Sequence, residues 1–242
     1  MNTAEQTVRD IALENPALVR VFERFGIDYC CGGRKPLAEA CAAKGLDVAE
    51  VEAALNGAAE DLGTGEVNWS LEPLAKLSEH IVSKHHAYVK AELPRLEMLA
   101  EKVVRRHGDT QPHLLELQRL VGEISTEMAQ HMTKEEIVLF PHIAKLEYAH
   151  AAGTPAPRGC FDSVERPIAV MTQEHEHAGT ALAQIRELSQ EFTPPVGACP
   201  TYRAYYQGLH EFEQDMHRHV HLENNVLFPR AIELEKLAVP VA

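Results

Sequence analysis

Two segments of this 242-residue chain are nearly the same. The segment HMTKEEIVLFP, residues 131–141, is matched by HVHLENNVLFP, residues 219–229. In each, a glutamate follows a histidine by four residues, and residues four apart lie on one face of an α-helix. The two pairs are His131 with Glu135 and His219 with Glu223. The repeat therefore predicts two helices that each present a nitrogen and an oxygen ligand. The LFP ends predict packing residues followed by a helix kink.

Most of the chain follows the apolar spacing of long helices. Segments rich in Gly and Pro separate them, and no run with the two-residue period of a strand competes. The helical segments span roughly residues 71–107, 111–148, 164–191 and 200–236. Four long helices with short connections predict an all-α fold, with an antiparallel four-helix bundle as its main part.

The first quarter of the chain predicts a separate, smaller unit. Residues 1–56 carry short apolar-periodic segments around the DYCCGG motif, which holds Cys30 and Cys31. Residues 57–70 are poor in apolar side chains and contain three glycines, so they read as a linker, and residues 71–242 form the bundle. Cys30 and Cys31 are interpreted either as small residues of a tight turn or as redox or metal-transfer thiols.

Apolar spacing also predicts which histidines face the interior. In the first long helix His86, rather than His85, falls in line with Val89 and Leu93. His175 is the one polar member of such a row in the third helix. The same test places three other histidines among polar neighbours, where they are expected to face solvent. These are His177, His217 and His221.

The four long helices together supply six inward-facing polar side chains. They are His86, His131, Glu135, His175, His219 and Glu223. Burying an unpaired carboxylate costs on the order of several kcal/mol, and a pair of metal ions removes that cost. Imidazole and carboxylate without thiolate favour iron or manganese over a closed zinc site. The sequence therefore predicts a metal centre with two ions in the bundle.

The repeat also distinguishes between two adjacent glutamates. Glu135 aligns with Glu223, whereas Glu136 aligns with Asn224, so Glu135 is the expected bridging ligand. Glu127 and Glu174 lie beside expected ligands and are candidates for groups that support them or line an access path.

Composition narrows the classes of partner. A formal charge of −13 disfavours nucleic acid, because affinity for its backbone depends on Lys and Arg. The N-terminal segment has no secretory signal pattern, and no stretch of about eighteen apolar residues predicts a membrane span. Five cysteines, two of them adjacent, fit thiols in a reducing compartment. We therefore expect a cytoplasmic protein that binds neither nucleic acid nor membrane.

These residues resemble a known family. The two eleven-residue segments, with His86 and His175, resemble the hemerythrin-like domain of the iron–sulfur cluster repair di-iron proteins. The DYCCGG motif in a short helical unit is similar to the small domain that precedes it in that family. The resemblance covers nearly the whole chain.

The resemblance implies a stress-induced protein with two non-haem iron ions, joined by an oxo or hydroxo bridge. Carried over to this chain, one iron would be bound by His86 and His219 and the other by His131 and His175. Glu135 and Glu223 would bridge both. The implied partners are iron–sulfur proteins or their apo forms, together with nitric oxide. A homodimer is among the expected assemblies.

Three functions remain open at this point. The protein could repair iron–sulfur clusters by donating iron, or it could scavenge nitric oxide and reduce it to N2O. It could also bind nitric oxide or O2 without turnover, as a sensor or carrier. Oxygen-carrying hemerythrins have a fifth histidine four residues after the position of His175, where this chain has Gly179. The missing imidazole implies an open position on one iron.

Overall fold

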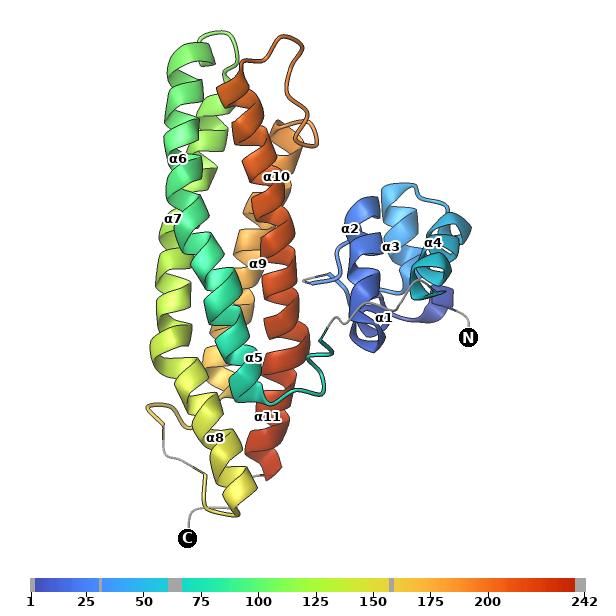
Figure 1. Ribbon diagram of the computed structural model, residues 1–242, viewed down its shortest axis with the longest axis vertical. Coiled ribbons are helices and arrows are strands. Elements are labelled where there is room, and N and C mark those ends of the chain that lie inside the picture. The colour runs from blue at the N-terminus through green and yellow to red at the C-terminus, as the bar shows by residue number, and fades with distance from the viewer. Residues whose placement is uncertain (1–2, 31, 61–66, 157–158, 238–242) are drawn as a thin grey trace.

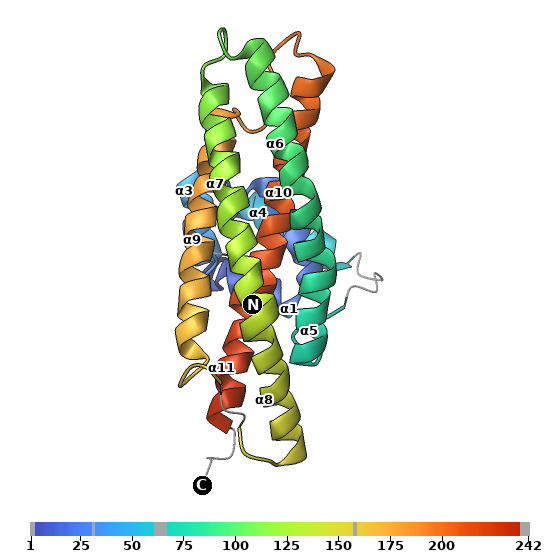
Figure 2. The ribbon, with the colours of Figure 1, turned by 90° about the vertical axis from the view of Figure 1, so that its left-hand side faces the viewer.

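Four long helical columns form the main body of the computed structural model, which describes residues 3–30, 32–60, 67–156 and 159–237. The columns lie side by side and alternate in direction, and the described residues contain no β-strand (Figures 1 and 2). The helices are α5 (Leu74–His80) with α6 (Ala87–His107), α7 (His113–Lys134) with α8 (Phe140–Ala152), α9 (Glu165–Leu188), and α10 (Pro200–His221) with α11 (Phe228–Leu237). The predicted all-α bundle is confirmed.

Three of the columns are interrupted by a π-helical segment. These segments are Ile81–His86, Glu135–Leu139 and Leu222–Leu227. Pro141 and Pro229 follow two of them in the first turn of the next helix, and both columns continue as helices. The neighbouring Phe140 and Phe228 are buried, as expected for packing residues. Single π-helical turns in α-helices are frequent at functional sites.

A small helical unit packs against the side of the bundle, next to α10 (Figure 1). Its helices are α1 (Val8–Glu14), α2 (Val19–Phe25), α3 (Leu37–Lys44) and α4 (Val48–Glu60). Gly26 ends α2 with φ of 63°, a left-handed conformation that glycine adopts without strain. Asp28 holds the next turn by accepting hydrogen bonds from the backbone N–H groups of Cys30 (2.9 Å) and Gly32 (2.8 Å).

Polar contacts join the small unit to the bundle. Asn225 donates from its side chain to the carbonyl oxygen of Tyr29 at 3.2 Å. The Arg218 guanidinium binds the Glu23 carboxylate through two hydrogen bonds of 2.6 Å each. The Tyr29 ring packs edge-on against His221, with the ring centroids 5.3 Å apart. The C-terminal end of α10 and the π-helical segment that follows it are therefore covered by protein on the face that points away from the bundle.

Two apolar clusters fill the interior of the bundle. One includes Leu96, Ile124 and Met216, and it continues into the small unit. The other lies around Phe140 and Phe228, toward α8 and α11. Along α7 and the π-helical segment after it, the inward-facing side chains belong first to the first cluster, then to a set of polar groups, and then to the second cluster. The polar layer between the clusters is where the candidate site lies. None of the helices in the described part of the chain is both long and apolar enough to cross a membrane.

Candidate metal centre

The structure brings together all six side chains that the sequence identifies as inward-facing ligands. Each is almost fully buried, with at most 1% of its surface exposed. They form two groups, in each of which the potential ligand atoms lie within 4.8 Å of one another. The first group is His86, Glu135, His219 and Glu223, and the second is His131, Glu135, His175 and Glu223. The two glutamates belong to both groups.

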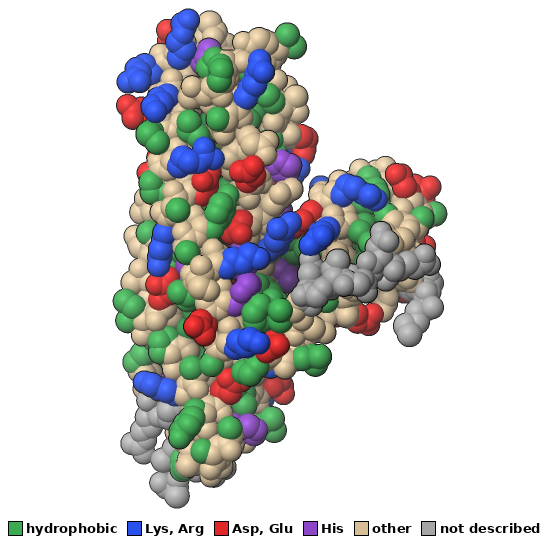
Figure 3. Space-filling view, viewed as in Figure 1, with side chains coloured by type: hydrophobic (Ala, Val, Ile, Leu, Met, Phe, Trp, Pro, Cys, Tyr) green, Lys and Arg blue, Asp and Glu red, His purple; other side chains and the backbone are tan. Residues whose placement is uncertain are grey.

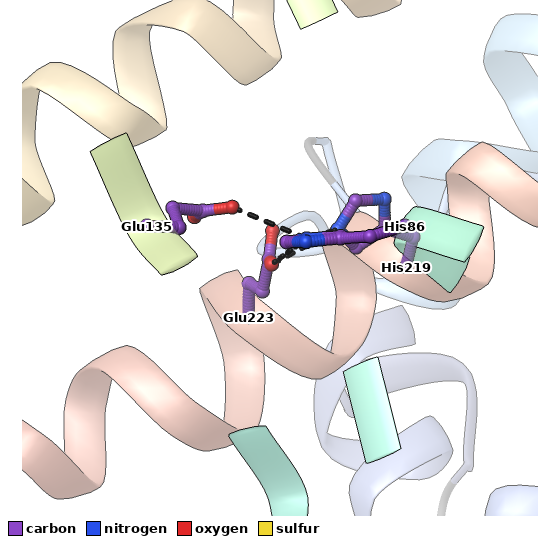
Figure 4. Close-up of side chains that lie close together, drawn as sticks. All are labelled: His86, Glu135, His219 and Glu223. Atoms are coloured by element: carbon purple, nitrogen blue, oxygen red, sulfur yellow. Dashed lines mark hydrogen bonds and ion pairs between the residues drawn. The ribbon is translucent and has the colours of Figure 1, made fainter. Parts of the chain in front are cut away.

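The first group joins α10 to the segment that precedes α6. The Nε2 atoms of His86 and His219 face each other at 3.1 Å. Glu223 Oε1 is 2.9 Å from His219 Nε2, and Glu135 Oε2 is 3.4 Å from His86 Nε2. Figure 4 shows both carboxylates pointing toward the two imidazoles. Two nitrogen and two oxygen ligands from three columns therefore converge on one point.

The second group repeats this arrangement between α7 and α9. The Nε2 atoms of His131 and His175 lie 3.0 Å apart. Glu223 Oε2 is 3.0 Å from His175 Nε2, and Glu135 Oε2 is 3.2 Å from His131 Nε2. Glu223 thus directs one carboxylate oxygen to each group, while Glu135 Oε2 faces both. Both carboxylates are therefore within reach of both groups.

The electrostatics of the six groups fit bound cations. Neither oxygen of the buried Glu135 carboxylate accepts a hydrogen bond from the residues that the structure describes. Burial lowers the pKa of His86, but the carboxylates of Glu135 and Glu223 outweigh this and raise the pKa to about 10. The same opposition raises the pKa of His131 to about 9. For His219 burial prevails, and its pKa is lowered. The carboxylates therefore favour positive charge at the positions where metal ions would lie.

The outer nitrogens of three imidazoles are held by hydrogen bonds. His86 Nδ1 is 2.7 Å from Glu136 Oε1, which also accepts from the Lys90 ammonium. His131 Nδ1 is 2.9 Å from Glu174 Oε2. His175 Nδ1 is 2.9 Å from Asn224 Oδ1. Such bonds fix the tautomer and orientation of a metal-binding imidazole. His219 Nδ1, by contrast, is buried without a partner among the described residues.

The sequence predicted Glu174 and Glu127 as groups that support the ligands. It did not predict that role for Glu136 or Asn224. Glu174 contacts His131, whereas Glu127 is exposed on α7. Glu136 and Asn224, which were set aside as bridging ligands, occupy equivalent positions of the repeat. Each follows a shared glutamate by one residue and supports a histidine of another column. This equivalence within the repeat is the sequence signal that could have identified both residues.

The π-helical segments position the ligands locally. Glu135 begins one segment, Glu223 is the second residue of another, and His86 ends the third. A π-helical turn holds more residues than an α-helical turn, so adjacent side chains face directions that regular spacing would separate. Glu135 and Glu136 consequently both reach imidazoles of the site.

Two expectations about the remaining histidines are wrong. His221 was expected to face solvent but is buried, because the small unit covers that side of α10 with Tyr29. His217 is half-buried near the same ring. His85 is also buried, and its Nδ1 lies 2.9 Å from Asp215 Oδ1. His177 is exposed, as expected.

The two adjacent cysteines lie in the small unit. Cys30 is buried, and its sulfur is 3.3 Å from Asp28 Oδ1. It borders a cavity of about 440 Å³ that Gly179 and His217 also line. Cys31 lies outside the described residues. The cavity extends between the small unit and the face of α9 that carries Gly179.

Comparison with known proteins gives matches over both parts of the chain. Residues 77–231 match the hemerythrin HHE cation binding domain. Residues 4–59 match ScdA_N, a domain of unknown function (DUF542). The chain is 37% identical over 235 residues to a protein of Yersinia pseudotuberculosis serotype O:1b (strain IP 31758) named iron-sulfur cluster repair protein YtfE. A protein of the same name from Yersinia pestis (strain Pestoides F) is also 37% identical. Each alignment covers 97% of this chain and all of the relative.

Proposed function

This chain belongs to the family of hemerythrin-domain iron–sulfur cluster repair proteins, and from that premise we propose that it repairs damaged clusters by donating iron. The observation that carries the proposal is the pair of buried His/Glu groups sharing Glu135 and Glu223. They can hold two iron ions, joined by an oxo or hydroxo bridge, with each ion bound by two imidazoles. The donated iron is then the cargo of the protein, and the acceptors are iron–sulfur proteins or their apo forms.

The proposed site suits an iron that must be both held and released. The two carboxylates attract the ion, and Glu136, Glu174 and Asn224 orient three of the four imidazoles. The ligand set contains no thiolate, and imidazole is a ligand that suits iron. We infer a cytoplasmic protein that acts when clusters are damaged by nitric oxide or oxidants. Cys30 and Cys31 are candidate thiols for passing iron or nitrosyl groups between sites.

A second function is favoured by one observation. The residue one helical turn after His175 is Gly179, so no fifth imidazole follows there. Gly179 lines the cavity between the small unit and the bundle. An open position on one ferrous ion could bind nitric oxide. Reduction of two nitric oxide molecules to N2O and water would take one electron from each of two ferrous ions and two protons from solvent. Scavenging or reduction of nitric oxide is therefore the alternative to iron donation.

Iron transfer to an acceptor distinguishes these functions. The chain is loaded anaerobically, and iron content is measured before and after mixing with an apo iron–sulfur protein. We expect about two irons per chain, as in other carboxylate-bridged bundles, and their appearance in the acceptor. The Glu223→Leu variant is the control that should transfer none. Retention of both irons, while added nitric oxide is consumed, would reject donation in favour of the alternative.

A further inference from the structure

A second cavity lies on the other side of the junction between the small unit and the bundle. Its volume is about 330 Å³, which is within the range of small-molecule sites. Helices α1 and α2 form one wall. The other wall consists of Trp69, the π-helical segment Ile81–His86 and the C-terminal end of α10. None of the six proposed metal ligands lines it. The cavity is therefore separate from the metal centre.

The charge of this cavity is opposite to that of the chain. Its described lining residues include the cations Arg20, Lys84 and Arg218 and no carboxylate, although the formal charge of the chain is −13. Figure 3 shows Lys, Arg and His side chains gathered where the small unit meets the bundle. Glu23 pairs with Arg218 from outside the cavity. Within the described part of the chain Lys84 forms no ion pair, so its ammonium can bind an anion.

Aromatic and aliphatic groups complete the cavity. The Trp69 ring stacks on His80, with centroids 4.1 Å apart and an interplanar angle of 28°. The Trp69 carbonyl accepts a hydrogen bond of 3.0 Å from Arg230, which ties this residue to the bundle. Tyr29 lines the opposite wall, and Leu13 and Val226 are among the aliphatic residues. A ligand with a flat apolar ring would bury that ring here, while its charged group meets the cations.

A single stacked ring lies between the cavity and the metal centre. His85 lines the cavity, and its ring lies parallel to that of His219, with centroids 5.6 Å apart and an interplanar angle of 7°. An occupant would therefore be separated from a proposed metal ligand by one imidazole layer.

We propose that this cavity binds a small aromatic monophosphate of nucleotide size. The ring occupies the space between Trp69 and Tyr29, and the phosphate binds Lys84 and Arg20. Phosphate is favoured because Lys and Arg together match its charge and geometry. This site goes beyond the proposed iron chemistry and does not depend on it.

The only tryptophan of the chain, Trp69, provides a direct readout. Adenosine monophosphate is titrated into the full-length chain while tryptophan emission is recorded. We expect saturable quenching, with binding weakened about fivefold in Lys84→Gln, as for loss of one partly exposed charge contact. Lys102→Gln, an exposed lysine on α6 that does not line the cavity, is the matched control and should bind as the wild type does.

Adenosine and inorganic phosphate test the two halves of the ligand, and each should bind more weakly than the monophosphate. Arg20→Gln, on α2, provides a second variant on a helix without metal ligands. It too should weaken binding. The proposal is overturned by absence of saturable quenching or by equal affinity for adenosine and its monophosphate. Equal binding by the wild type and both cavity variants would overturn it as well.

Discussion

The two halves of the metal centre use the same ligand types but hold them differently. In the half formed by His131 and His175, both outer nitrogens have partners, Glu174 and Asn224. In the half formed by His86 and His219, His86 has one, whereas His219 has none in the described part of the chain. Because outer hydrogen bonds raise ligand basicity and fix ring orientation, the half formed by His86 and His219 (the first half) should bind its ion less tightly than the half formed by His131 and His175 (the second half). A donor with one looser ion can release iron without dismantling the whole site.

Glu223→Leu should have the largest effect, because it damages both halves of the metal centre and so abolishes the difference in ion affinity between them. Each oxygen of Glu223 faces one half, so we expect metal content to fall close to zero. The metal-free variant should also be less stable than the metal-free wild type, by about 3–5 kcal/mol, because the buried imidazoles that face Glu223 lose their carboxylate partner. Metal analysis and urea unfolding measure the two effects.

His177→Ala is the matched control for Glu223→Leu, because His177 lies on α9 close to His175 but is exposed. It should keep both ions and the wild-type free energy of unfolding. If Glu223→Leu retained one tightly bound ion, Glu223 would serve one half only. The bridging role would then be wrong.

Periodicity along single helices was sufficient to predict the bundle and the clustering of the six buried polar groups. Each of these side chains lies in a row of apolar residues, so its direction follows from helix geometry. Helical spacing did not predict the burial of His85, because this residue lies in a π-helical segment, where His85 and His86 are both buried. The burial of His221 was missed for another reason. The small unit covers the face of α10 that carries His221, and spacing within one helix does not show that another unit packs on that face.

Asn224→Ala should make the two halves more alike. It removes the acceptor of His175 Nδ1 and should weaken the second ion by about 10–100-fold, the usual effect of losing such a partner. In the wild type we expect a chelator to remove metal in a fast phase from the first half and a slow phase from the second. In Asn224→Ala the slow phase should approach the fast one.

Glu136→Ala is the complementary variant, because Glu136 occupies the equivalent position of the repeat and supports His86 in the first half. It should accelerate the fast phase and leave the slow one unchanged. If either variant changed both phases equally, the two halves would be coupled too strongly for the outer hydrogen bonds to distinguish them.

His85→Phe should have the smallest effect and should act in the opposite direction. Asp215 Oδ2 and His219 Nδ1 are both buried without a partner among the described residues, and they lie one turn apart on α10. His85 engages the other oxygen of Asp215 at 2.9 Å. Phenylalanine keeps a ring beside His219 but releases that oxygen, so Asp215 can turn to accept from His219 Nδ1. One added hydrogen bond of about 1 kcal/mol should slow the fast phase a few-fold.

The control for this last variant is His80→Phe, which keeps a ring beside Trp69 and removes no bond to Asp215. Its chelator kinetics should match those of the wild type. A faster first phase in His85→Phe would mean that the His85–Asp215 pair already stabilises the first half through the stacked ring. The weaker hold on that ion would then have to originate in the ligands themselves, and not in the missing outer partner of His219.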